Sequence, residues 1–243
     1  MASSLSAPWD EWDVYDDALL PNLAAPFTPT TGLSGMTQYH LAVTLTNNLD
    51  RLDGAAHIRY TNRVTATLDS IYLHLFPNLW HDGMTISDVR AGGQAVSPKL
   101  LSGDSLAQIP LPQPLAPGQS VELALRFSDP IPSGLEVGNY GEFALQDGVL
   151  ALASFYPTVV VNDGKWHLET PSSIGDVVYA RASLYDVSLT APAQLTVVAT
   201  GETVGRQDNA DGTVMWRLVG GRCAISISSL APISVWRPAA WVM

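Results

Sequence analysis

Residues 39–45 read Tyr-His-Leu-Ala-Val-Thr-Leu, a stretch in which large apolar residues alternate with smaller or more polar ones. Successive side chains of an extended strand point to opposite faces, so this period of two predicts a half-buried β-strand. One face would carry Tyr39, Leu41, Val43 and Leu45, while the other face would be mostly polar. The stretch indicates the fold class, because the same alternation returns along most of the chain.

Further alternating runs follow, and residues that favour turns separate them. Short alternating strands with such regular punctuation predict an all-β fold, an antiparallel β-sandwich of two or three sheets. The other runs are 71–75, 121–127, 185–189, 195–199, 214–218 and 223–227. The predicted turns include Asn47-Asn48, Asp53-Gly54, Gly92-Gly93, Pro117-Gly118, Asp147-Gly148, Asp163-Gly164 and Asp211-Gly212.

The N-terminal segment has a different pattern from the rest. Trp9, Trp12, Tyr15 and Leu19 recur at helical spacing in an acidic stretch, which predicts a short helix or arm. A segment rich in Pro, Thr and Gly follows and has the composition of a surface linker. The predicted organisation is an arm and linker at 1–36, a β-domain at 37–236 and a tail at 237–243.

The charge composition excludes some partners and suggests another. The 243-residue chain has 12 Lys and Arg against 23 Asp and Glu, a net charge of −11. Nucleic acid and anionic membranes are disfavoured as binding partners, because proteins that bind them carry basic surface patches. Charged residues make up only 14% of the chain, against roughly 25% in a typical soluble domain. This shortage suggests that part of the surface is covered by a partner domain.

Cys223 is the only cysteine, so the chain has no intrachain disulfide and no cysteine-based zinc site. No apolar run approaches the roughly 18 residues needed to span a membrane as a helix. Met1 to Pro8 lack the basic and apolar regions of a signal peptide. The compartment stays open; a location outside the cytoplasm would require that a signal sequence had been removed.

The sequence contains no recognisable catalytic motif. Zinc peptidases hold their metal with two histidines one helical turn apart, and no H-E-x-x-H motif occurs here. We therefore predict no catalytic residue, no metal ligand and no cofactor in this chain. The histidines are His40, His57, His74, His81 and His167, and the carboxylates in loop-like stretches that could form a hydrolytic pair are Glu136, Glu142, Glu169 and Asp176.

Aromatic residues concentrate in one segment, 138–175, in which the alternation is broken. Exposed rings there could stack on sugars or dock a partner, and rings in a sandwich core are the equally weighted alternative. Under the first interpretation the segment faces a substrate cleft or a partner and does not form plain sheet strands. The residues concerned are Tyr140, Phe155, Tyr156 and Trp166.

An ordered series of short motifs resembles the N-terminal domain of the gluzincin zinc aminopeptidases, the family that includes aminopeptidase N and leukotriene hydrolase. The resemblance covers about residues 37–230 and is nearest to bacterial members. It rests on Leu52-Asp53-Gly54, Ile58–Asn62, Ile71–Asn78, Leu115–Gly118, Asn139–Gly141, Ser154–Pro157, Gly175–Tyr179, Tyr185–Pro192 and Val198–Gly201.

In that family the N-terminal domain is a saddle of β-sheets, and the domain that carries the zinc helix follows it. The resemblance therefore implies a saddle-like, non-catalytic domain that supports a zinc peptidase domain in cis and walls its substrate cleft. Tyr156 falls where members often place a Glu or Gln that binds the substrate's free amine. The zinc would lie in the absent catalytic domain, and peptide substrate would reach this chain only at the edge of the cleft.

Two other functions stay open at this stage. A free-standing β-sandwich module could bind carbohydrate or protein through its aromatic loops, because a fold does not define a function. A diverged, inactive relative could serve as an assembly surface. A zinc-binding helix encoded downstream of Met243 would favour the peptidase hypothesis.

Overall fold

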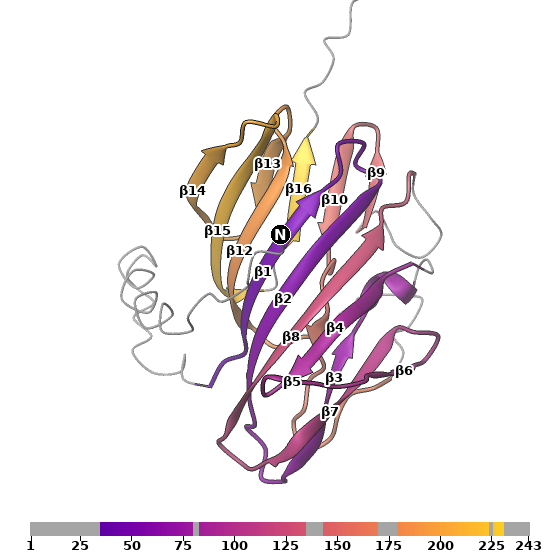
Figure 1. Ribbon diagram of the computed structural model, residues 1–243, viewed down its shortest axis with the longest axis vertical. Helices are drawn as coiled ribbons and strands as arrows, with labels where there is room; N and C mark the ends of the chain where they lie inside the picture. Colours follow the sequence, from indigo (N-terminus) through magenta and orange to yellow (C-terminus); the bar gives the residue numbers. More distant parts are fainter. Residues whose placement is uncertain (1–34, 80–82, 135–142, 170–178, 224–225, 231–243) are drawn as a thin grey trace, which may run out of the picture. The chain divides into compact units, whose positions relative to one another are not determined.

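The computed structural model describes residues 35–79, 83–134, 143–169, 179–223 and 226–230, and strands dominate these ranges (Figure 1). β1 (Gln38–Leu45) confirms the alternation from which the fold class was predicted. Tyr39, Leu41, Val43 and Leu45 are all buried in the hydrophobic core. All the described residues belong to the compact unit that begins at Gly35.

The largest sheet, sheet A, has eight strands. Its central strand β1 is hydrogen-bonded to β2 on one side and to β12 on the other. In spatial order the strands are β14 (Glu202–Asp208), β15 (Thr213–Cys223), β12 (Ser183–Pro192), β1, β2 (Arg51–Thr61), β8 (Ser120–Pro130), β4 (Thr85–Ala91) and β5 (Gln94–Ala95).

Two four-stranded sheets pack against sheet A (Figure 1). A short 3₁₀ turn, Phe76–Leu79, follows β3 (Leu68–His74). Sheet B consists of β11 (Thr158–Val159), β3 (Leu68–His74), β7 (Leu106–Leu115) and β6 (Lys99–Leu101). Sheet C consists of β13 (Thr196–Ala199), β16 (Ser226–Leu230), β10 (Val149–Ala153) and β9 (Phe143–Gln146).

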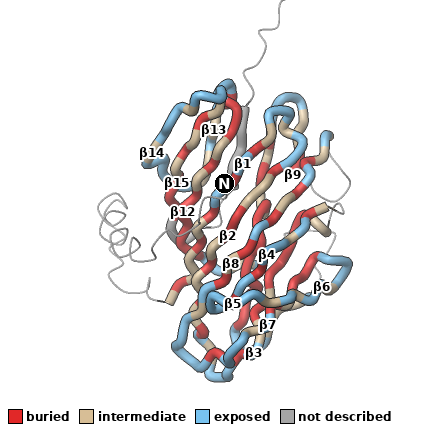
Figure 2. Tube along the Cα trace, in the orientation of Figure 1, coloured by how far each residue is buried: buried red, intermediate tan, exposed pale blue. Residues whose placement is uncertain are grey.

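One continuous core joins the three sheets. Figure 2 shows buried and more exposed positions alternating along the strands of sheet A, as expected for a sheet with one face covered. Leu125 of sheet A, Ile71 of sheet B and Leu152 of sheet C are all members of the same buried cluster. Burial of each such side chain stabilises the fold by roughly 1.5–3 kcal/mol. The predicted all-β fold with three sheets is therefore confirmed.

The strand directions differ from the prediction at one place. β1 runs parallel to β12, with Tyr39 opposite Tyr185 and Val43 opposite Leu189. The other strand pairs are antiparallel, so sheet A is mixed. Alternation reports which face of a strand is buried, but it carries no information on the direction of the neighbouring strand.

The predicted turn at Asp53-Gly54 is wrong. Gly54 lies inside β2, directly opposite Phe127 of β8. A β-carbon on Gly54 would lie 2.2 Å from the Phe127 ring, so glycine is required here to leave room for the ring. The chain turns earlier, between β1 and β2. At Asp147-Gly148, in contrast, both residues have positive φ, as a tight hairpin turn needs.

The segment 138–175 also departs from the prediction. We expected it to lack plain sheet strands, yet β9 and β10 form an antiparallel hairpin with Leu152 opposite Phe143. The alternation is hidden because both faces of β10 carry apolar residues, in the sequence Val-Leu-Ala-Leu-Ala. A strand of this kind cannot be recognised by a contrast between polar and apolar faces.

The chain passes between sheets A and C at a glycine. β13 belongs to sheet C, β14 belongs to sheet A, and Gly201 lies between them with φ +102°. A β-carbon on Gly201 would lie 2.3 Å from the carbonyl oxygen of Val219. Both the backbone conformation and the close approach therefore require glycine at this corner.

The predicted N-terminal helix or arm and the C-terminal tail lie outside the described residues, and the domain boundaries stay a prediction. Among the described residues, no helix is long and apolar enough to cross a membrane.

Candidate functional site

The outward face of sheet C is a candidate docking surface. The strand register places Val198 of β13 and Ala151 of β10 in one row, because both pair with Ser228 of β16. A second row contains Val149 and Thr196, which both pair with Leu230. We call this surface the neutral face; its register positions are Thr196, Val198, Ser226, Ser228, Leu230, Val149, Ala151, Ala153, Ala144 and Gln146.

None of these ten positions carries a charged residue. Two of them, Val198 and Val149, are 56% and 39% exposed and are among the most exposed large hydrophobic residues of the described chain. A solvated sheet face normally carries polar and charged side chains. The neutral face therefore has the composition of a covered surface while its two valines are open to solvent.

The opposite side of the same strands is apolar as well. Leu150 and Leu152 of β10 are fully buried in the core, and Val197 of β13 packs against it. β10 thus presents apolar residues on both faces, as strands do when both faces are buried. On the outward side, Val149 is exposed, Ala151 and Ala153 are half-buried and Ala144 is buried.

The outward face of sheet A has a different character, and an ion-paired group lies at its centre. The guanidinium of Arg217 contacts Asp186 through two hydrogen bonds, from Nε at 3.2 Å and from Nη2 at 2.9 Å. Nδ1 of His40 lies 3.4 Å from the same carboxylate. Burial alone would raise the pKa of Asp186, but hydrogen bonds from His40 and Arg217 and the Arg217 charge outweigh it and lower the pKa.

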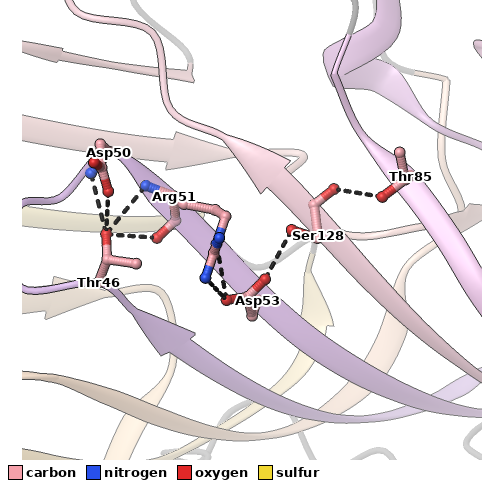
Figure 3. A network of polar contacts seen from close by, with 6 residues as sticks. All are labelled: Thr46, Asp50, Arg51, Asp53, Thr85 and Ser128. Atoms are coloured by element: carbon pink, nitrogen blue, oxygen red, sulfur yellow. Dashed lines mark hydrogen bonds and ion pairs between the residues drawn. The ribbon is translucent and has the colours of Figure 1, made fainter.

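A second polar network lies near the turn between β1 and β2 (Figure 3). The hydroxyl of Thr46 donates to the Asp50 carboxylate at 2.6 Å. Asp53 pairs with the Arg51 guanidinium at 3.0 Å and accepts a 2.7 Å hydrogen bond from the Ser128 hydroxyl. These contacts link β2 to β8 on the solvent side of the sheet, where charges are readily hydrated.

Two of the predicted site residues, Phe155 and Tyr156, lie in the core. Their exposed fractions are 0% and 1%. The Tyr156 hydroxyl hydrogen-bonds to that of Tyr185 at 3.0 Å, and the Tyr156 ring packs edge-on against Tyr39, with centroids 5.6 Å apart. Within this chain both residues follow the core-packing alternative, because neither ring is accessible at the surface.

Trp166 lies at the edge of the core, half-buried and packed against it. Its ring contacts Tyr72 at a centroid distance of 5.3 Å and Tyr60 at 6.1 Å. Tyr140 lies outside the described residues. The structure therefore does not gather the four predicted aromatic residues into one exposed group, and their role at a cleft stays a prediction.

The histidines are dispersed. His40 and His57 lie on neighbouring strands of sheet A, and burial followed by the His40 charge lowers the pKa of His57. His74 is buried in sheet B, and burial lowers its pKa to about 4, so it is neutral at physiological pH. His81 lies outside the described residues. Among the described residues, no three His, Cys, Asp or Glu side chains lie close enough together to hold a metal ion.

The predicted carboxylate candidates do not form a described pair. Glu169 is largely exposed and contacts Lys165 at 3.5 Å and His167 at 3.8 Å. His167 lies 2.8 Å from Asp163, a carboxylate that was not among the candidates from the sequence. Glu136, Glu142 and Asp176 lie outside the described residues.

The neutral face was not predicted from the sequence. The sequence feature that indicates this face is Val149–Ala153, where apolar residues occupy both the odd and the even positions of the strand and so both of its faces. Broken alternation of this kind predicts a segment without plain strands, and so it conceals β10. The general shortage of charge did point to a covered surface, but it could not locate that surface.

In a comparison with solved structures, the chain is similar in fold to part of several M1 zinc metallopeptidases. A substituted form of the enzyme from Deinococcus radiodurans, bound to a Tyr-Ser-Ala substrate, matches 80% of this chain with a TM-score of 0.57 and 16% identity. The enzyme from the same organism without the substitution matches 79% with a TM-score of 0.53 and 19% identity. A two-domain M1 zinc metallopeptidase bound to L-tryptophan matches 80%, with a TM-score of 0.55 and 16% identity.

The chain spans only 40–42% of the length of these three structures. At such low identity the likeness shows the shared fold alone. No family model matches the sequence, and no curated protein matches it.

Proposed function

We propose that this chain is the non-catalytic N-terminal β-domain of a zinc metallopeptidase of aminopeptidase type. In this proposal the domain packs against the catalytic domain of the same protein through the neutral face and forms one wall of its substrate cleft. Peptide substrate meets the chain only at the edge of that cleft.

The neutral face is the observation that carries the proposal. An uncharged surface of four strands, with two exposed valines, gains free energy when it is covered, at roughly 25 cal/mol per Å² of apolar surface removed from water. Obligate interfaces are more apolar than the rest of a protein surface and have few charges at their centre. On the outward face of sheet A, the Arg51–Asp53 and Arg126–Asp88 ion pairs are exposed to solvent, whereas Asp186, the partner of Arg217, is buried.

The comparisons support the choice of partner. The solved structures compared above are M1 zinc metallopeptidases, and the matched part is about two fifths of each chain. The remaining three fifths of a protein built in this way would supply the partner domain. The described residues of this chain offer no cluster of metal ligands, so the zinc and its activated water would belong to that partner.

The proposal can be tested on the full-length gene product with two matched pairs of substitutions. Val149→Glu combined with Val198→Glu puts two charges on the neutral face. Ala42→Glu combined with Thr44→Glu puts the same two charges on exposed positions of β1 in sheet A. Calorimetry of the full-length protein and of this chain alone then separates docking from folding.

We expect both double variants of the isolated chain to unfold close to the parent temperature, because all four positions are solvent-accessible. In the full-length protein, the neutral-face variant should lose the coupling between domains, unfold in two separate transitions and lose peptidase activity. The sheet A variant should keep one transition and its activity. A gene product without a zinc peptidase domain, or equal behaviour of the two variants, would contradict the proposal.

A further inference from the structure

A small cavity opens where β1 and β12 begin and β2 ends. Its space is about 30 Å³, enough for about two water molecules. Its walls come from sheets A and B and from the stretch 158–162. The cavity is separate from the neutral face, so a ligand site in it would be independent of the proposed docking.

The charged residues that line this cavity are both basic. Arg63 and Arg181 line it, and no Asp or Glu does. This is unusual in a chain with 23 acidic and 12 basic residues. Among the described residues neither guanidinium lies within ion-pair distance of a carboxylate, although the His167 hydrogen bond and, to a smaller extent, the Arg181 charge lower the pKa of Asp163. The described contact of Arg181 is a 3.3 Å hydrogen bond to the Asn162 carbonyl oxygen.

Two buried side chains add donors that have no partner within the described part of the chain. Tyr60 is 7% exposed and lines the cavity, and its hydroxyl has no hydrogen bond to any described residue. Asn162 is 8% exposed; its Oδ1 accepts from the Gly164 amide, and no described residue accepts from its Nδ2. Both side chains line the cavity, so a hydroxyl and an amide N–H₂ group are available to an acceptor brought by a ligand.

Two other hydroxyls in the wall already donate to backbone carbonyl oxygens. Thr158 donates to the Tyr156 carbonyl oxygen at 3.1 Å, and Ser183 donates to the Arg181 carbonyl oxygen at 3.1 Å. Burial raises the pKa of Tyr60, and the positive charge of Arg181 acts in the opposite direction, so the guanidinium lies near the phenol. The phenol remains protonated at neutral pH and can donate.

We propose that this cavity binds a small oxyanion, a carboxylate or phosphate group, between the guanidinium groups of Arg63 and Arg181, the Tyr60 hydroxyl and the Asn162 amide. Arginine forks match the oxygen atoms of both anions, and charge-assisted hydrogen bonds are the stronger kind. The cavity accepts only the head group, so the rest of a larger ligand would extend into solvent.

The amide signals of Val160, Val161 and Asn162, residues that line the cavity, provide a local readout in ¹H–¹⁵N NMR spectra of this chain. Inorganic phosphate is titrated at constant ionic strength. A second arm uses an N-acetylated tripeptide with a free C-terminal carboxylate, and the same tripeptide with a C-terminal amide. We expect saturable shifts with phosphate, with the free carboxylate, or with both, and no response to the amide. Saturation by only one of the two anions identifies the source of the head group.

Arg181→Gln and Arg63→Gln should each weaken binding about tenfold, since each removes a charge-assisted hydrogen bond. Tyr60→Phe should weaken it less. Arg126→Gln, which removes an exposed arginine that is paired with Asp88 on sheet A, should leave affinity unchanged. The proposal fails if no anion gives saturable shifts, if the amide peptide binds equally, or if Arg126→Gln weakens binding as much as the cavity variants. Arg63→Gln and Arg181→Gln each test the proposal independently, so the test remains possible if one of the two variants misfolds.

Discussion

The outward faces of sheets A and C differ although both sheets cover the same core. Sheet A places ion pairs such as Arg217 with Asp186 on its outer side, and its strands alternate between apolar and polar residues. Sheet C carries no charge at its outward positions and exposes Val149 and Val198. Inward packing is therefore alike in the two sheets. The outward side of sheet A carries ion pairs, one of which includes the buried Asp186, and the outward side of sheet C is covered, in our proposal, by a second domain.

The comparison of sheets A and C assumes that both pack on one rigid core. A substitution of Tyr156, which connects the two sheets, tests this assumption and should have the largest effect on stability. Tyr156 follows β10 of sheet C and packs on Tyr39 and Tyr185 of sheet A. Tyr156→Ala should lower the free energy of unfolding by about 3–5 kcal/mol, as for other large aromatic residues removed from a core. Chemical denaturation of the isolated chain measures the change.

Tyr156→Phe is the matched control, because it keeps the ring and removes the hydroxyl that donates the 3.0 Å hydrogen bond to Tyr185. It should cost about 1 kcal/mol. If Tyr156→Ala left stability unchanged and instead raised KM in the full-length enzyme, the cleft-facing interpretation of this residue would be correct.

The corner between the two sheets gives the next largest effect. Gly201→Ala should destabilise the chain by about 2–4 kcal/mol, because it combines a left-handed backbone with a clash against the Val219 carbonyl. Gly212 also has positive φ, but a β-carbon there would have no described atom within 4 Å. Gly212→Ala should therefore cost only about 1 kcal/mol. Thermal unfolding of the two variants would contradict this account if their losses were equal.

The smallest effect concerns the charged face of sheet A. Arg217→Met should raise the pKa of Asp186 and cost about 1.5–3 kcal/mol at neutral pH, since it removes charged hydrogen bonds from a buried carboxylate. The folded-state pKa of Asp186 is lowered, so its stabilising contribution is present above the unfolded pKa of about 3.9 and disappears as pH falls through the folded value. The difference from the parent should vanish in acid. An equal loss at pH 7 and at pH 2 would mean that Arg217 acts by packing alone.

Much of the fold could be predicted because alternation determines which residues are buried. For Tyr39, Val43 and Leu125, the alternation alone predicts burial correctly. The parallel pairing of β1 with β12 depends on contacts distant in sequence and leaves no local signal. The position of Gly54 depends on the Phe127 ring, which lies on another strand.

The candidate site was much less predictable. The covered surface was inferred from the shortage of charge, but Val149 and Val198 come together only through the register of β16. Tyr156 was singled out by its place in a motif, which carries no information on its burial. Arg63 and Arg181 are 118 positions apart, and only the meeting of β2 with β12 through β1 brings them to one cavity.

Chemical labelling of the neutral face tests the central claim most directly. In a Cys223→Ser background, Val198→Cys is compared with Ala42→Cys, an exposed position of sheet A, for the rate of reaction with a maleimide. Both should react quickly in this chain alone. In the full-length protein, we predict that Val198→Cys becomes at least about tenfold slower while Ala42→Cys is unchanged, because burial in an interface excludes the reagent. Equal rates at Val198→Cys in the isolated chain and in the full-length protein would contradict the claim that this face docks a second domain.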